Sequence, residues 1–144
     1  MQRILVCLDA SARAPSVLST AADLARRTGA KLRLFRAVGL PPEIDQELLV
    51  HSGTPLVDGL REKATKELAA LATSLPEGVF EASEVALGTP WDAICREAKA
   101  SNADLVVLGS HGYSGFDRVI GTTAAKVVNH CDRSVLVVKS PDAK

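Results

Sequence analysis

The amino-acid sequence predicts an α/β fold: a single-domain, open, Rossmann-like parallel sheet of five strands, in the order 3-2-1-4-5, with helices on both faces. Short apolar runs alternate along the chain with segments in which apolar residues recur every three or four positions. Strands that alternate with helices form parallel sheets, and right-handed crossovers leave few ways to wind them. A chain of 144 residues is about the size of one ordinary domain, and we expect residues 1–144 to form it.

Five apolar runs of strand length mark the expected strands. They occur at ILVCLD (4–9), KLRLFRAV (31–38), VFEASEVAL (79–87), LVVLGS (105–110) and SVLVVKS (134–140). Because a helical pattern lies between each run and the next, the strands are expected to pair in parallel and to be covered on both faces.

Two amphipathic patterns separate the first three strands. The first has an apolar stripe over residues 14–25 and is followed by Gly29, which can adopt the left-handed conformation that ends helices. The second carries apolar residues at spacings of three and four over residues 57–75 and ends before Pro76. The irregular segment 39–55, with its paired prolines, is expected to be a lid or a partner-binding loop.

Two further helices follow the third and fourth strands. Thr89 is the expected N-cap of the first of them, with Pro90 in the first turn and Asp92 placed to reach back to the cap. The last helix has the pattern TAAKVVNH (123–130). Both helices are expected to pack on the sheet.

Composition and charge exclude several classes of function. Hydrophobic residues make up 47% of the chain and aromatic residues only 3%, so the core must be aliphatic. Seventeen acidic residues balance seventeen basic ones, so no net field attracts nucleic acid or an anionic membrane, and we expect neither as a partner. The three cysteines show neither disulfide nor zinc spacing, which favours a cytoplasmic location. No apolar run approaches the ~18 residues of a membrane span.

Topology and glycine chemistry predict the same ligand site. In an open parallel sheet, ligands bind at the carboxyl ends of the strands where the winding direction reverses, here between strands one and four. Strand one is followed by Asp9, Ala10 and Ser11, and strand four ends at Leu108 and Gly109. Both sets of residues should therefore lie at this position.

The segment LVVLGSHGYSGFDRVIGT (105–122) reads as a strand, a glycine turn, a loop and a helix start, which is typical of a phosphate site. Gly109 and Gly112 allow a tight turn, and the helix start offers unpaired amides. The residues expected around the phosphates are Leu108, Gly109, His111, Gly112, Gly121, Thr122 and Thr123.

Asp9 can accept a hydrogen bond from a ribose hydroxyl or hold a Mg²⁺ ion that bridges phosphate oxygens. Main-chain groups near Ala37 and Val38 are candidates to bind the base. Each signal has a plainer interpretation: the glycine pair as an ordinary turn, Asp9 or Ser11 as a helix cap, and His111 as a solvent-facing loop residue.

The order of elements and three motifs resemble the universal stress protein family over essentially the whole chain. The motifs are Asp9-Ala10-Ser11, the GTP of residues 88–90, and GSHG…GT…SVLVV. ATP-binding members carry glycine, two residues, glycine, nine residues, then glycine and serine or threonine. Gly109, Gly112, Gly121 and Thr122 match this pattern, although here eight residues separate Gly112 from Gly121.

The resemblance implies an ATP-binding regulatory module of the stress response, with ATP held with or without Mg²⁺. It places Asp9 near the ribose or metal and Val38 near adenine. It also implies a homodimer through the last strand, which is an apolar sheet edge with nothing to discourage pairing. The residues at that interface are Val135, Leu136, Val137 and Val138.

Two other functions remain open: a nucleotide-free dimeric scaffold, and a slow ATPase or autophosphorylating protein. The sequence lacks the Walker A lysine spacing and any kinase-type catalytic set, so an enzyme is the less favoured. A phosphate-accepting receiver domain would need an acidic pair after strand one and an aspartate ending strand three, where this chain has Leu87.

Overall fold

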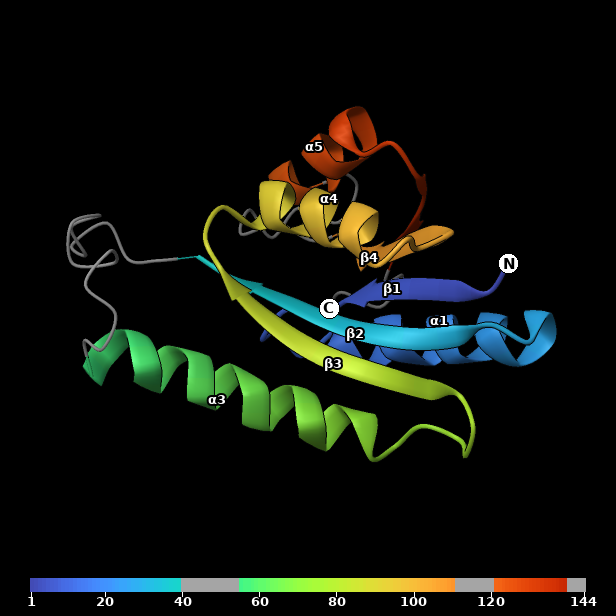
Figure 1. Cartoon of the computed structure of the whole chain (residues 1–144), viewed down its shortest axis with the longest axis horizontal. Coiled ribbons are helices and arrows are strands. Elements are labelled where there is room, and N and C mark those ends of the chain that lie inside the picture. Colours follow the sequence, from blue (N-terminus) through green and yellow to red (C-terminus); the bar gives the residue numbers. More distant parts are fainter. Residues whose placement is uncertain (40–54, 111–120, 140–144) are drawn as a thin grey trace.

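A computed structural model of the chain describes residues 1–39, 55–110 and 121–139. Nine helices and strands fall within these ranges (Figure 1). In chain order they are β1 (Arg3–Cys7), α1 (Ala14–Thr28), β2 (Lys31–Val38), α3 (Pro55–Ala72), β3 (Phe80–Leu87), α4 (Pro90–Ala100), β4 (Leu105–Gly109), α5 (Thr122–His130) and β5 (Ser134–Val138). The sheet order is β3-β2-β1-β4-β5 and every pair is parallel, which confirms the predicted fold class and strand order.

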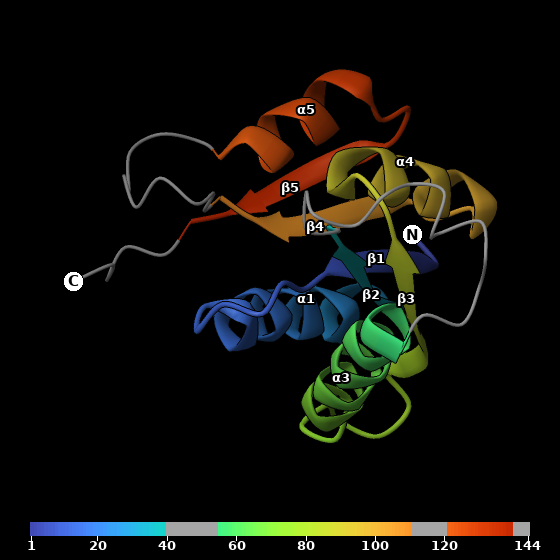
Figure 2. The ribbon, with the colours of Figure 1, turned by 90° about the vertical axis from the view of Figure 1, so that its left-hand side faces the viewer.

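The sheet is covered by two layers of helices (Figure 2). Alternate residues of each strand face opposite layers, as the period of a strand requires. Ile4 and Val6 pack with buried residues of α1 and α3, whereas Leu5 and Cys7 pack with those of α4 and α5. Both cores are largely aliphatic. No helix within the described ranges is long and apolar enough to cross a membrane.

The helix ends follow the sequence signals in part. Gly29 adopts φ 77°, and its N–H donates to the Ala25 carbonyl at 2.8 Å, so the predicted left-handed end of α1 is confirmed. Thr89 is the N-cap of α4, but its side chain makes no cap hydrogen bond. The expectation that Asp92 reaches back to this cap is wrong, because its carboxylate pairs with Arg96 one turn along the helix, at 2.9 Å.

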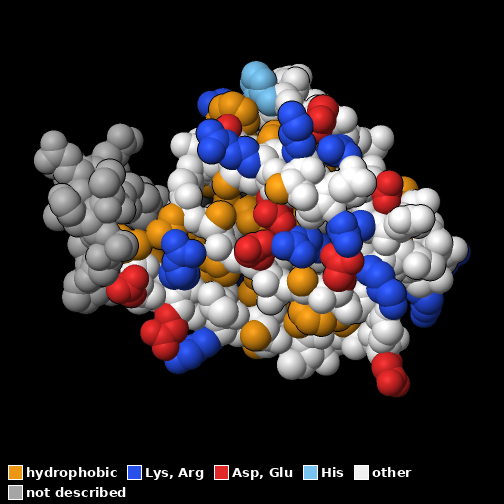
Figure 3. Space-filling model, viewed as in Figure 1, with side chains coloured by type: hydrophobic (Ala, Val, Ile, Leu, Met, Phe, Trp, Pro, Cys, Tyr) orange, Lys and Arg blue, Asp and Glu red, His pale blue; other side chains and the backbone are white. Residues whose placement is uncertain are grey.

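Charged side chains cover the part of the sheet face that α4 leaves open beside β3. Arg3 pairs with Glu81 at 2.6 Å, and Arg33 pairs with both Glu84 and Glu97 at 2.6 Å. Figure 3 shows acidic and basic side chains interspersed over this face. The ion pairs therefore cover this part of the face without building a region of one sign.

Two strands end two residues earlier than predicted. β1 stops at Cys7 rather than at Asp9, and β5 stops at Val138. The N–H of Leu8 still donates to the Phe35 carbonyl at 2.9 Å, but the Leu8 carbonyl accepts from the side chain of Arg36 instead of from a main-chain N–H of β2. Asp9 consequently lies just beyond the sheet, in the turn that leads to α1.

Candidate functional site

A cavity of about 450 Å³ opens at the carboxyl ends of β1 and β4. Its walls come from the ends of β1, β2 and β4, the turn and first residues of α1, and the starts of α4 and α5. This is the point where the winding direction of the sheet reverses, as the strand order requires. The cavity therefore lies where the topology places a ligand.

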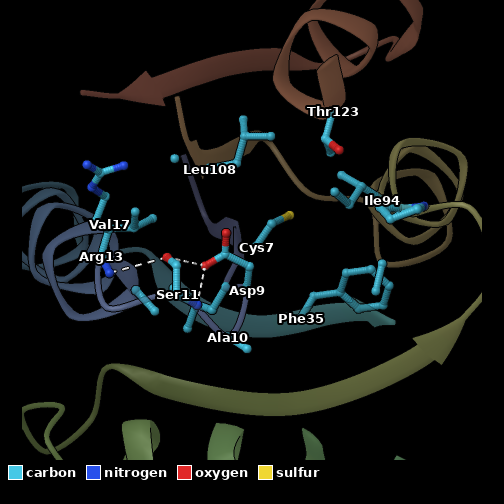
Figure 4. A pocket seen from close by; sticks show the side chains of 15 residues that line it. Cys7, Asp9, Ala10, Ser11, Arg13, Val17, Phe35, Ile94, Leu108 and Thr123 are labelled. Atoms are coloured by element: carbon cyan, nitrogen blue, oxygen red, sulfur yellow. Dashed lines mark hydrogen bonds between the residues drawn. The ribbon is translucent and has the colours of Figure 1, made fainter. Parts of the chain in front are cut away.

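The turn after β1 is built around the Asp9 carboxylate. Oδ1 of Asp9 accepts from the Ser11 N–H at 3.0 Å and from the Ser11 hydroxyl at 2.6 Å, and the Arg13 N–H donates to Ser11 Oγ at 3.2 Å. Arg13 is the N-cap residue of α1, and no side chain caps that helix. Asp9 and Ser11 thus stabilise the turn before α1. Oδ2 of Asp9 takes no hydrogen bond from another described residue, and Figure 4 shows it directed into the cavity.

Arg13 also lines the cavity, and the sequence analysis did not identify it. Asp9 and Arg13 are the only charged side chains among the described lining residues. The described lining residues thus carry one positive and one negative formal charge. The signal available in the sequence was a cation four positions after Asp9, at the start of the first helix.

One end of the cavity is apolar. Cys7, Phe35, Pro90 and Ile94 contribute side chains to it, together with Ala37. Figure 4 shows Phe35 and Ile94 on the same side of the cavity, away from Arg13. This wall offers a flat apolar group a place out of water.

Main-chain groups at this end belong to Ala37 rather than to Val38. In β2, the main-chain N–H and C=O groups of odd-numbered residues point toward β1, because the Lys31 N–H donates to the Gln2 carbonyl and the Phe35 carbonyl accepts from the Leu8 N–H. Ala37 is the next odd residue, and beyond the end of β1 the described part of the chain offers its N–H and C=O no partner. Val38 does not line the cavity, and its carbonyl accepts from the Gly88 N–H at 3.0 Å.

The opposite end of the cavity is formed by the end of β4 and the start of α5. Leu108, Gly109 and Thr123 line it, and Figure 4 shows the Thr123 hydroxyl directed inward. Thr122 is exposed and is not part of the lining. The predicted contacts of His111 and Gly112 lie outside the described residues.

Hydrogen bonds fix both ends of the segment between β4 and α5. The Gly121 N–H donates to the Ser110 carbonyl at 2.7 Å, and the Ser110 N–H donates to the Val138 carbonyl at 2.9 Å. Gly121 is the N-cap of α5 and has no side chain to bond the first amides of the helix. These amides carry the partial positive charge of a helix start, next to the cavity wall.

Gly109 has a packing role whatever it binds. A Cβ atom at this position would lie 3.2 Å from Cγ2 of Val17 on α1. The absence of a side chain thus allows the end of β4 to approach α1 closely, and it shapes the cavity at the same point.

Neither Cys7, which lines the cavity, nor Cys131, at the far end of α5, has a thiol suited to catalysis. Burial raises the pKa of the Cys7 thiol well above its usual value. Burial, followed by a hydrogen bond with Cys95, raises the pKa of Cys131 to about 12. Both groups stay protonated at neutral pH and are poor nucleophiles. Within the described residues, no three histidine, cysteine or acidic side chains group as a metal site.

The sequence matches one family along almost its whole length. The model of the universal stress protein family matches residues 1–139. Universal stress protein Sll1388 of Synechocystis is 30% identical over 149 aligned residues, which cover 95% of this chain and 97% of that protein.

Solved structures agree at the level of the fold. Hypothetical protein MJ0577 has a TM-score of 0.81 at 21% identity, covering 98% of this chain and 97% of that one. A universal stress protein in complex with cAMP has a TM-score of 0.60 at 23% identity, with 96% of each chain covered. A universal stress protein from Archaeoglobus fulgidus in complex with dAMP has a TM-score of 0.61 at 20% identity, covering 96% of this chain and 98% of that one. With this sheet order and these matches, the chain belongs to the universal stress protein family.

Proposed function

We propose that this protein is a regulatory module that binds an adenine nucleotide, with ATP as the expected ligand, in the cavity between β1 and β4. The observation that carries the proposal is the arrangement of one cavity with three different surfaces. It has an apolar wall with main-chain groups of Ala37 and a carboxylate oxygen of Asp9 that no described residue bonds, and Thr123 in the first turn of α5. The cAMP and dAMP complexes of structural relatives support this choice of ligand.

Each surface suits one part of the nucleotide. The base fits the apolar wall of Phe35 and Ile94, where the N–H and C=O of Ala37 can bond an acceptor and a donor on the adenine edge. The ribose hydroxyls can donate to Asp9 Oδ2. The phosphates suit the amides at the start of α5, with Gly109 and Thr123 alongside.

Mg²⁺ can be accommodated, but with few protein ligands. Mg²⁺ commonly binds one or two carboxylates together with phosphate oxygens and water. Asp9 is the one carboxylate among the described lining residues, so a bound ion would take most of its ligands from phosphate and water. Asp9 would then contact the metal rather than the ribose. The contribution of Asp9 to ATP affinity would depend on Mg²⁺ in the first role and not in the second.

Isothermal titration with ATP, ADP, AMP and GTP, each with and without Mg²⁺, tests this function. We expect ATP to bind more tightly than GTP, because a guanine edge reverses the donor and acceptor that Ala37 must meet. Asp9→Asn should weaken ATP binding equally in both conditions if Asp9 holds the ribose, and more strongly with Mg²⁺ if it holds the metal. Asp104→Asn is the matched control, since Asp104 bonds the Gln2 and Arg3 amides away from the cavity. No binding of any adenine nucleotide at about millimolar concentration would overturn the proposal.

A dimeric scaffold is the second candidate function, and it can coexist with nucleotide binding. Within the described residues β5 pairs with β4 alone and lies at the sheet edge, and Leu136 is 37% exposed. A second copy that adds its own β5 would cover this edge, through Val135, Leu136, Val137 and Val138. Binding of nucleotide would then act on a homodimer.

We expect turnover of ATP to be slow at most. Asp9 is the one carboxylate among the described lining residues: Ser11 bonds one of its oxygens, and the proposed binding mode assigns the other to the ribose or to Mg²⁺. In that mode no described lining side chain is left to activate water or a hydroxyl. The free thiols Cys7, Cys95 and Cys131 suit a reducing cytoplasm as the place of action.

A further inference from the structure

Arg36 is a buried arginine beside the cavity that no step of the proposed function has used. It lies on β2, its exposure is only 6%, and its side chain is on the sheet face that α1 and α3 cover. Nε donates to the Leu8 carbonyl at 2.9 Å, Nη2 donates to the Asp9 carbonyl at 2.9 Å, and Nη1 pairs with Glu67 of α3 at 3.2 Å. Three of its nitrogens therefore have oxygen partners, two of them in the turn that carries Asp9.

The bond to Leu8 replaces a bond of the sheet. In a parallel ladder, the residue that donates to Phe35 accepts in turn from the N–H of Ala37. Leu8 donates to Phe35, but Arg36 Nε binds its carbonyl instead. The β1–β2 ladder thus ends at this point, and the N–H of Ala37 is left for a ligand.

The bond to Asp9 holds the other polar group of the cavity. Nη2 binds the main-chain carbonyl of Asp9, while the side chain of that residue accepts from Ser11. The position of Asp9 is therefore fixed by two contacts: the guanidinium of Arg36 binds its main-chain carbonyl, and Ser11 binds its side chain. Bonds from a buried guanidinium are stronger than bonds between neutral groups.

The geometry points to Arg36 as a positioning residue of the nucleotide site, which sets both Asp9 and Ala37 for the ligand. Glu67 supplies the counter-charge that keeps the guanidinium in place. This inference rests on the proposed function for its ligand, but its structural part concerns the turn alone. Holding binding groups in place before the ligand arrives lowers the cost of ordering them on binding.

The first test needs no ligand. Hydrogen exchange followed by mass spectrometry should show faster exchange of the amides of residues 8–13 in Arg36→Met than in the wild type, with the amides of β4 unchanged. Arg36→Lys, which keeps the charge and one or two donors, should lie between the two. Arg33→Met is the matched control, because Arg33 lies on the same strand and also loses ion pairs, but its partners Glu84 and Glu97 lie outside the cavity.

The second test measures selectivity. The wild type should prefer ATP over 2′,3′-dideoxy-ATP, because only ATP has the hydroxyls that Asp9 accepts. Arg36→Met should lower the affinity for ATP by roughly tenfold and remove most of this preference, as expected for the loss of one well-placed polar contact. Arg33→Met should keep both the affinity and the preference of the wild type, and Arg36→Lys should recover part of both.

These outcomes separate the two claims. If the wild type binds no adenine nucleotide, the proposed function fails, while exchange in residues 8–13 still decides whether Arg36 holds the turn. The inference is wrong if Arg36→Met binds ATP with the same affinity as Arg33→Met. It is also wrong if Arg36→Met loses affinity for ATP and dideoxy-ATP equally and its amides exchange faster throughout the sheet, because Arg36 then has only a general stabilising role. If Arg36→Met does not fold, the same comparisons are made between Arg36→Lys and Arg33→Lys.

Discussion

Among the described lining residues of the cavity, the two charged side chains belong to one turn. Asp9 would repel phosphate on its own, and Arg13 at the start of α1 offsets it. Figure 4 shows the Arg13 side chain near Val17, at the end of the cavity away from Phe35. A cation at this end suits the charged part of a nucleotide better than the base.

Arg13→Gln should therefore weaken the binding of ATP and ADP and leave that of adenosine unchanged. We expect a loss of roughly tenfold for ATP, equivalent to about 1.4 kcal/mol, with a smaller dependence of ATP affinity on salt. Titration calorimetry at two salt concentrations measures both effects, with Arg13→Lys as the control that keeps the charge. Equal losses for adenosine and ATP would show that Arg13 shapes the turn instead of attracting phosphate.

Gly109 has a packing role in addition to its proposed place beside the phosphates. Gly109→Ala should destabilise the fold by about 1 kcal/mol, because its new methyl group meets Val17. In the Val17→Ala background the same change should cost less, since the space is then free. Denaturant unfolding of the four proteins gives the coupling. A cost that is independent of residue 17 would show that the clash is not what makes glycine necessary.

At the scale of elements, periodicity predicted the fold well and register poorly. The alternation of apolar runs with helical stripes gave the strand order, and Gly29 marked the end of α1. The sequence does not show the register between β1 and β2. That register decides which residue of β2 lies just beyond the end of β1, and it places Ala37 rather than Val38 in the cavity lining. The bonds of Arg36 depend on the same register, so no local pattern could reveal them.

β5 is the element on which the proposed dimerisation depends. The Ser110 N–H donates to the Val138 carbonyl, so the main-chain groups of even-numbered β5 residues bond β4. The N–H groups of the odd-numbered residues Val135 and Val137 therefore point away from the sheet. Val137→Pro removes one of these outward donors without breaking a bond to β4. It should give monomers in sedimentation velocity, whereas Val137→Ala should stay dimeric. A dimer that survives Val137→Pro would place the interface elsewhere.

At the scale of the whole molecule, the two helical layers bring distant parts of the chain to one cavity. Lining residues come from five stretches of the chain, the ends of β1, β2 and β4 with the turn into α1 and the starts of α4 and α5, and the sheet fixes their relative positions. The face over β2 and β3 carries ion pairs of mixed sign, so it gives no long-range attraction toward a polyanion (Figure 3). Recognition must therefore be local.

A nuclear magnetic resonance titration of the ¹⁵N-labelled protein with ATP tests the central claim most directly. Binding in the cavity should shift the amide signals of Ala37, Asp9, Gly109 and Thr123 together, along one saturable curve, and leave those of the β3 edge in place. GTP should shift Ala37 less than ATP does. No shift at these four amides up to about millimolar ATP, or a set of shifts centred on another face, would contradict the account.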